Sequence, residues 1–118
     1  MATSFSVDRD SFRRSFADLI EADGTFLLVA DFRGRAGGYL LGFTHLAFFA
    51  NGPVAWVEEV AVEPQLRRQR LGAQLMTEFE RQVNAAGAQL VALATRRAAG
   101  FYEAIGYEPS ATYFRKIL

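Results

Sequence analysis

The chain has 118 residues, of which 51% are hydrophobic, and its 13 acidic and 13 basic side chains give a formal net charge of zero. This length suits one domain with one core, and the neutral charge disfavours general electrostatic binding of nucleic acid. The absence of cysteine excludes disulfides and a thiolate nucleophile, and a single histidine excludes a histidine-rich metal centre.

The first 24 residues predict one amphipathic helix. Asp8 or Asp10 can cap its start, and apolar residues then recur at helical spacing from Phe12 to Ile20. The helix is expected to end near Asp23-Gly24.

An antiparallel hairpin is predicted next. Thr25–Phe32 and Tyr39–Phe49 are rich in aromatic and aliphatic residues and are separated by the polar, glycine-rich segment Arg33–Gly38. After the turn residues Asn51-Gly52-Pro53, a third strand is expected over Val54–Val62.

The second half of the chain alternates helices with strands. A helix containing Leu71, Leu75 and Val83 is expected to stop at Gly87, and the short apolar strand Leu90–Thr95 follows. The order strand, helix, strand implies a right-handed crossover between parallel neighbours. A short helix over Ala98–Ile105 and a final strand over Tyr113–Leu118 complete the expected elements.

The segment from Val60 to Ala73 runs from a buried strand through a turn into a helix. The first N–H groups of a helix have no partners within it, and its dipole is positive at that end, so phosphate oxygens bind there favourably. Gly72 permits close approach of a ligand, and Arg67, Arg68 and Arg70 add positive charge. The local pattern is also compatible with a solvated cluster of arginines.

This segment resembles the cofactor signature of the GNAT superfamily of N-acetyltransferases, R/Q-x-x-G-x-G/A, with Arg67, Arg70 and Gly72 at its first, fourth and sixth positions. Arg70 stands where glycine is usual, and we expect it not to need a positive φ. The later segment Thr95–Tyr107 resembles a second motif of the superfamily, N-x-x-A-x-x-F-Y-x-x-x-G-F/Y, with Thr95 in place of asparagine. The resemblance covers Val54–Leu118, and it implies an α/β (α+β) fold. That fold has a mixed, mostly antiparallel twisted sheet flanked by helices, a parallel strand pair at the cofactor cleft and a shortened N-terminal part.

The resemblance also implies a division of the single domain, with the acceptor side in residues 1–53 and the acetyl-CoA half in residues 54–118. The pyrophosphate of acetyl-CoA would lie on the loop, and backbone groups of the preceding strand would hold the pantetheine arm. Tyr102 would be the general acid toward the departing thiolate, for which a protonated phenol is suited. The residues implied in cofactor binding are Val60, Ala61, Val62, Arg67, Arg68, Gln69, Arg70, Leu71, Gly72 and Ala73.

Acetyl transfer to an amine requires a neutral nitrogen, so a carboxylate near the acceptor is the natural base. Glu58 and Glu59 are adjacent on the third strand, and strand alternation predicts that they point to opposite faces. Resemblance to polyamine acetyltransferases, which carry an acidic pair on this strand, favours Glu58. Either residue could also be an ordinary surface charge.

The remaining expectations concern location and partners. Residues 1–10 contain no apolar run of leader length and no segment reaches membrane-spanning length, which favours a cytoplasmic protein without a membrane partner. The family's first strand has no counterpart before Thr25, so the open sheet edge predicts a homodimer. The acceptor would be a small-molecule or peptide amine, with no metal and no nucleic acid. A non-catalytic sensor or interaction module that binds CoA or a nucleotide is the alternative function.

Overall fold

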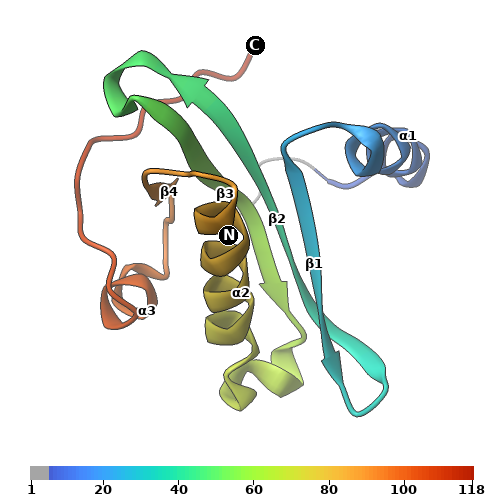
Figure 1. The fold of residues 1–118 in the computed structure, drawn as a ribbon. Helices are drawn as coiled ribbons and strands as arrows, with labels where there is room; N and C mark the ends of the chain where they lie inside the picture. Colours follow the sequence, from blue (N-terminus) through green and yellow to red (C-terminus); the bar gives the residue numbers. More distant parts are fainter. Residues whose placement is uncertain (1–5) are drawn as a thin grey trace.

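The computed structural model describes residues 6–118, and Figure 1 shows its fold. Within this range no helix is long and apolar enough to cross a bilayer. The elements are α1 (Arg9–Glu21), β1 (Thr25–Phe32), β2 (Arg35–Ala47), η1 (Phe48–Ala50), β3 (Gly52–Val62), η2 (Pro64–Gln69), α2 (Leu71–Ala85), β4 (Val91–Leu93) and α3 (Ala99–Ala104), where η1 and η2 are 3-10 helices.

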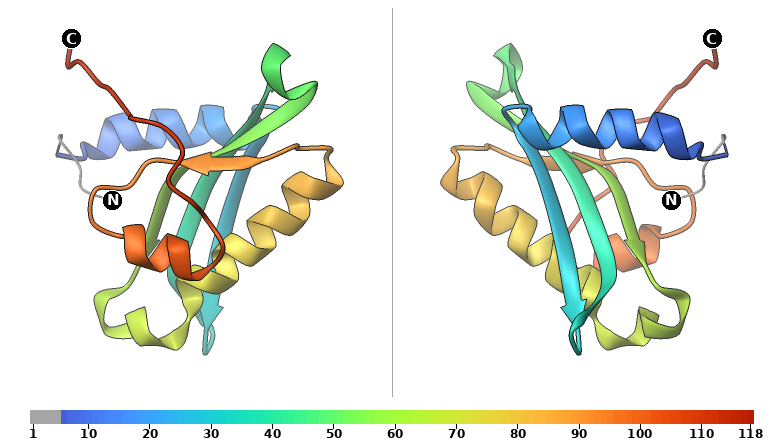
Figure 2. Two further views of the ribbon diagram at one scale, coloured as in Figure 1. Left: turned by 90° about the vertical axis from the view of Figure 1, so that its left-hand side faces the viewer. Right: turned by 90° about the vertical axis from the view of Figure 1, so that its right-hand side faces the viewer.

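The four strands form one sheet in the order β1-β2-β3-β4. The pairs β1–β2 and β2–β3 are antiparallel, and β3–β4 is parallel. The views in Figure 2 show α2 against one side of this sheet and α1 on the other side. The mixed α/β architecture predicted from the sequence is therefore confirmed.

The β1–β2 hairpin is tighter than predicted. Its turn consists of Arg33 and Gly34 alone, with φ angles of 53° and 85°, as in the turns that match the twist of paired strands. β2 therefore begins at Arg35 and not at Tyr39. At its other end Phe48 and Phe49 leave the sheet for the η1 turn, because Asn51 takes a left-handed conformation there.

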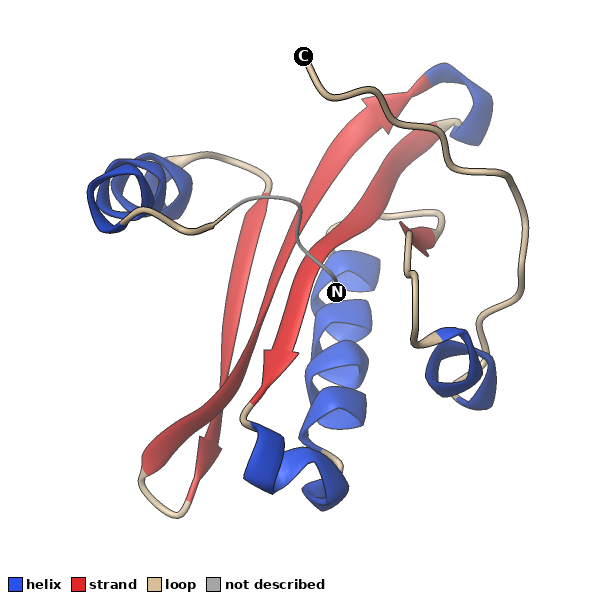
Figure 3. Cartoon of the chain, turned by 180° about the vertical axis from the view of Figure 1, so that it is seen from behind, coloured by secondary structure: helices blue, strands red, loops and turns tan. Residues whose placement is uncertain are grey.

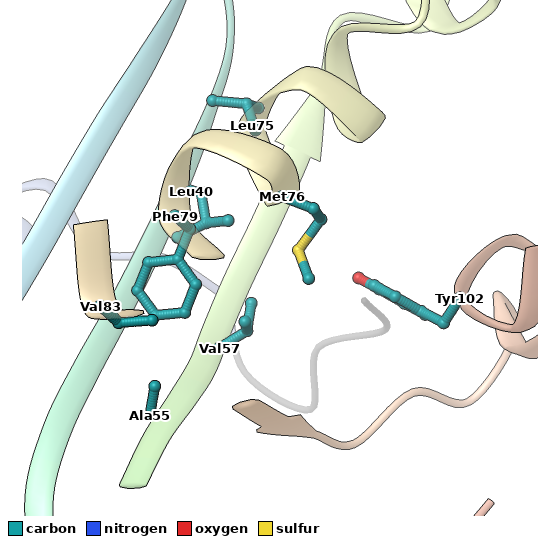
Figure 4. Packing of buried hydrophobic residues seen from close by; sticks show 8 residues of the cluster. All are labelled: Leu40, Ala55, Val57, Leu75, Met76, Phe79, Val83 and Tyr102. Carbon is teal, nitrogen blue, oxygen red and sulfur yellow. The ribbon is translucent and has the colours of Figure 1, made fainter. Parts of the chain in front are cut away.

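The core lies between α2 and the sheet. Phe79 is fully buried beneath the first strands, and its ring occupies the space over Gly42, where a Cβ would lie 2.5 Å from Phe79 Cε1. Figure 4 shows the buried cluster that α2 and α3 share with the sheet. Its members are Leu40, Ala55, Val57, Leu75, Met76, Phe79, Val83 and Tyr102.

The predicted helix at the start of the chain is confirmed, and Asp8 is the residue that caps it. The Asp8 carboxylate accepts a hydrogen bond of 2.9 Å from the N–H of Ser11. No residue of α1 is buried, although the helix touches β1. Figure 1 shows α1 beside β1 and apart from α2.

The expected strand over Tyr113–Leu118 is wrong. Figure 3 shows the segment after α3 as a loop, and every residue of it from Glu108 onward is exposed. The ring of Tyr113 stacks on Trp56 with centroids 6.4 Å apart, so a side-chain contact rather than a strand ladder holds this end of the chain. β4 is also shorter than predicted, because only residues 91–93 pair with β3.

Candidate active site

The start of α2 leaves three backbone donors without a protein partner. The first bond across this helix start runs from the N–H of Gln74 to the carbonyl of Arg70, and no side chain caps the helix. Among residues 6–118, the N–H groups of Leu71, Gly72 and Ala73 make no hydrogen bond to the protein. An uncapped helix start with exposed surroundings is favourable for an anion.

Arg70 has a conformation that the sequence did not predict. Its φ of 63° and ψ of 22° place it in the left-handed region, so the expectation that it needs no positive φ is wrong. Arg70 is the single residue between η2 and α2, so the change of direction from one helix to the next falls on its backbone. This is the conformation that glycine adopts most easily, which gives a physical reason for glycine at this position of the signature.

The three arginines of the segment are exposed and available. Arg67 and Arg68 lie in the last turn of η2, while Arg70 follows it. Within the described residues none of the three forms an ion pair or a side-chain hydrogen bond. Gln69 lies between them on η2 and is exposed as well. The segment that leads to the free N–H groups therefore carries three positive charges that no described residue neutralises.

Gly72 lies where three elements meet. A Cβ at this position would lie 3.4 Å from the Phe101 ring of α3 and 4.0 Å from Cγ2 of Val62 on β3. The end of β3, the start of α2 and the start of α3 therefore converge beside the free donors. A longer side chain at Gly72 would occupy this space.

β3 also offers free backbone groups next to the start of α2. The N–H of Glu63 donates to the carbonyl of Gly37, so residues 59, 61 and 63 turn their backbone groups toward β2. The backbone groups of Val60 and Val62 therefore point toward the β4 side of β3. They remain open there, because β4 pairs with β3 only as far as Val57. Of the three predicted strand residues, Val60 and Val62 present open backbone groups, whereas Ala61 is engaged in the sheet.

The expectation that Glu58 and Glu59 point to opposite faces is wrong. Leu41 pairs with Glu59 and Gly42 pairs with Val57, so Glu58 is an extra residue in a β-bulge. Because the bulge shifts the alternation by one residue, both side chains lie on the face opposite α2. Glu58 accepts a hydrogen bond of 2.8 Å from Trp56 Nε1, on the same strand.

The side chain of Tyr39 forms a hydrogen bond with Glu59, the second carboxylate of the acidic pair. Its hydroxyl donates a hydrogen bond of 2.7 Å to Glu59, and burial together with this bond and the nearby charge raises the pKa of Tyr39 to about 12. Tyr39 and Trp56 were not predicted as hydrogen-bond partners of the acidic pair. Only the unpredicted bulge brings these four side chains to one face.

Tyr102 is buried on α3 with its hydroxyl directed toward Met76, as Figure 4 shows. Its ring makes edge contacts with Phe101 and Tyr107, with centroids 4.9 and 5.9 Å apart. The hydroxyl makes no hydrogen bond, and no described side-chain polar atom is both fully buried and unpaired, so this oxygen reaches accessible space. Burial raises the pKa of Tyr102, which keeps the phenol protonated at neutral pH.

Thr95, which replaces the asparagine of the second motif, has a structural role. Its hydroxyl accepts a hydrogen bond of 3.1 Å from the N–H of Ala98 and so fixes the turn before α3. After α3, the hydroxyl of Tyr107 donates to Glu80 of α2 at 2.6 Å. These two bonds position the helix that carries Tyr102.

Comparison with known proteins defines the class to which this fold and site belong. Residues 22–109 match the family model of the acetyltransferase (GNAT) domain, and the chain is therefore a member of the GNAT acetyltransferase family. A search among curated proteins found no match.

Solved structures share the fold at low sequence identity. An aminoglycoside acetyltransferase from an uncultured soil metagenomic sample, in complex with sisomicin, is 19% identical with a TM-score of 0.81, over 98% of this chain and 78% of that chain. Glucosamine-6-phosphate N-acetyltransferase from Arabidopsis thaliana is 21% identical with a TM-score of 0.84, over 98% and 82%. A transcriptional regulator from Bacillus halodurans C-125 is 23% identical with a TM-score of 0.86, over 92% and 76%.

Proposed function

We propose that this protein transfers the acetyl group of acetyl-CoA to a primary amine by direct attack in a ternary complex. The observation that carries this proposal is the set of free N–H groups on Leu71, Gly72 and Ala73, next in the chain to arginines that pair with no described residue. These donors fit the pyrophosphate of acetyl-CoA, which supplies the acetyl group as an activated thioester. The open backbone groups of Val60 and Val62 lie between the helix start and the acidic pair, where they can bind the pantetheine arm.

The acidic pair supplies the base for the amine. An alkyl ammonium with a pKa of about 10.4 requires roughly 4 kcal/mol to become neutral at pH 7, and a nearby carboxylate can take its proton directly or through water. Glu58 is the proposed base, and Glu59 on the same face adds negative charge that attracts a cationic acceptor. The nitrogen lone pair then forms the new bond to the acetyl carbon as the carbon–sulfur bond breaks.

Tyr102 is the proposed acid for the leaving thiolate. Its protonated hydroxyl donates the proton that converts the thiolate of CoA into a thiol. The nitrogen loses two protons in all: Glu58 takes one from the ammonium and releases it to solvent, and the second leaves as the amide forms and restores the Tyr102 hydroxyl.

The proposed acceptor is a small-molecule or peptide amine. Two structurally similar proteins are named for an aminoglycoside and for glucosamine-6-phosphate, which supports a small amine as the first class to screen. In this proposal residues 54–118 bind acetyl-CoA, residues 1–53 border the acceptor, and the protein acts in the cytoplasm as a homodimer.

The test combines binding with turnover. Calorimetry with acetyl-CoA should show binding to the wild type and none to Gly72→Glu, because the new carboxylate fills the space beside Phe101 and repels the phosphates. Thr77→Glu adds the same charge to an exposed site of α2 and should bind normally. Thiol release should then depend on the amine in a panel of acceptors.

The second candidate, a CoA or nucleotide sensor without turnover, is favoured by Arg70 at the glycine position of the signature. It predicts acetyl-CoA binding that also requires Gly72, but no release of thiol with any amine. Failure of the wild type to bind acetyl-CoA would contradict both candidates.

A further inference from the structure

The free edge of β1 is long, apolar and unprotected. Within the described residues β1 pairs only with β2, although it extends over Thr25–Phe32. Natural proteins usually protect such an edge with lysine, proline or a bulge, whereas the one charged residue of β1 is Asp31, and the register shift between Ala30 and Asp31 leaves its extra residue, Gly37, on β2.

The hydrogen-bonding groups of this edge can be assigned residue by residue. The N–H of Thr44 donates to the carbonyl of Gly24, so the even-numbered residues of β1 bond to β2. Leu27, Val29 and Asp31 therefore present their N–H and C=O groups outward, and Thr25 presents its C=O, because its own N–H donates to the carbonyl of Ala22 at 3.4 Å. Beside them runs a groove of about 310 Å³, which β1 residues 27–31 form together with Gln74, Leu75 and Glu78 of α2.

We propose that this edge binds a second copy of the chain, with the two β1 strands antiparallel and the register centred on Leu28. Leu27 of one copy then pairs with Val29 of the second copy, and both are apolar and at least 38% exposed in the single chain. Asp31 lies beside the hydroxyl of Thr25. The Leu28 side chains, which face α2, meet at the two-fold axis within the groove.

Charge complementarity selects this register. When the register is continued beyond the strands, Asp23 of one copy lies near Arg33 of the second copy. The two-fold symmetry places the same pair at the other end of the interface. Both residues are exposed and neither forms an ion pair within residues 6–118, and the Arg33 guanidinium lies 5.2 Å from the centroid of the Phe32 ring. Shifting the register by two residues in one direction places Asp31 opposite Asp23 of the second copy. Shifting it by two residues in the other direction places Asp31 opposite Leu27. Both shifts are unfavourable.

The interface is modest in size. A strand pair alone buries less than the roughly 800 Å² per partner of a standard interface. α1 lies beside β1 (Figure 1), and its residues Phe12, Phe16 and Ile20 are between 42 and 57% exposed, so they offer further apolar area. We therefore expect association in the micromolar range, and it does not depend on acetyl transfer.

The decisive experiment uses charge reversal and mixing. Asp23→Arg alone places two arginines together at each end of the interface, and Arg33→Asp alone places two aspartates together. In sedimentation equilibrium each variant should dimerise about tenfold more weakly than the wild type. An equimolar mixture should recover wild-type association, because one end of the heterodimer then pairs the two substituted residues, Asp23→Arg with Arg33→Asp, and the other end pairs the native Arg33 with the native Asp23. A mixture as weak as the single variants would overturn the register.

A second pair of variants tests the edge itself. Val29→Lys places a charge opposite Leu27 of the second copy and should make the protein monomeric, whereas Val29→Thr keeps the branched shape and should still dimerise. Circular dichroism should show both variants folded, because Val29 is 59% exposed. A monomeric wild type, or dimerisation of Val29→Lys equal to that of the wild type, would overturn the proposal. A monomer whose Leu27 and Val29 amides resist hydrogen exchange would mean that another segment covers the edge, which also overturns it.

Discussion

The two long helices of this protein begin in opposite ways. α1 begins at Asp8, whose carboxylate occupies the N–H of Ser11, and buries none of its residues. α2 begins at Arg70 without any side-chain cap, and it buries Leu71, Leu75, Met76, Phe79 and Val83. A helix held by its core contacts can leave its first N–H groups free, whereas an exposed helix depends on its cap. Because core packing stabilises α2, the helix needs no cap at its N-terminus, and its first N–H groups stay available to a ligand.

The largest expected effect tests the packing of α2. Phe79→Ala removes a fully buried ring and should lower the free energy of unfolding by about 3–5 kcal/mol. Phe16→Ala on α1 removes a ring that is 42% exposed and should cost about 1 kcal/mol or less. Urea unfolding followed by circular dichroism measures both. Equal losses would remove the contrast between the helices.

Tyr102→Phe sharpens the comparison by separating chemistry from packing in the half of the chain that contains α2. The substitution keeps the buried ring and removes the hydroxyl, so turnover should fall about 100-fold while the affinity for acetyl-CoA stays the same. Steady-state kinetics and calorimetry measure the two quantities. A large loss of affinity would show that the hydroxyl supports the binding site rather than the reaction.

Arg70→Gly tests the conformation at the start of α2. Glycine adopts a φ of 63° without the strain that a side chain brings, which is worth roughly 1 kcal/mol. The greater freedom of glycine in the unfolded chain offsets part of this gain. The melting temperature should therefore rise slightly, whereas Arg68→Gly, within the 3-10 helix, should lower it. A destabilised Arg70→Gly variant would contradict the left-handed conformation.

The smallest expected effect concerns the cap of α1. The hydrogen bond from Ser11 holds the pKa of Asp8 below its usual value. A carboxyl whose pKa is lowered on folding stabilises the protein above its unfolded pKa, and this contribution is lost as pH falls through the folded pKa. Asp8→Ala should therefore melt earlier than the wild type at neutral pH, and the difference should vanish in strong acid. Asp10→Ala is the matched control, and a gap that persists in strong acid would exclude the charged cap.

The elements that follow from local pattern were predictable. The apolar spacing of α1 and α2, the strands β1 and β3 and the cap at Asp8 all follow from residue periodicity and capping chemistry. The two motifs in the second half of the chain likewise indicated the family before the structure did.

The features that depend on contacts between distant segments of the chain were not predictable from the sequence. The bulge at Glu58 exists only in the register between β2 and β3, and one extra residue reverses the face of every side chain after it. The alternation of Tyr113–Leu118 resembles a strand, but a strand needs a neighbour, and Tyr113 instead stacks on Trp56. The left-handed Arg70 follows from the meeting of η2 and α2, and η2 was itself not expected.

The most direct measurement is the change in backbone amide resonances when acetyl-CoA is added to the protein labelled with nitrogen-15. The signals of Leu71, Gly72 and Ala73 should move the most as their free N–H groups bind phosphate oxygens, while that of Ser11, already bonded to Asp8, should not move. Unchanged signals at the start of α2 in the presence of bound acetyl-CoA would contradict the proposed site.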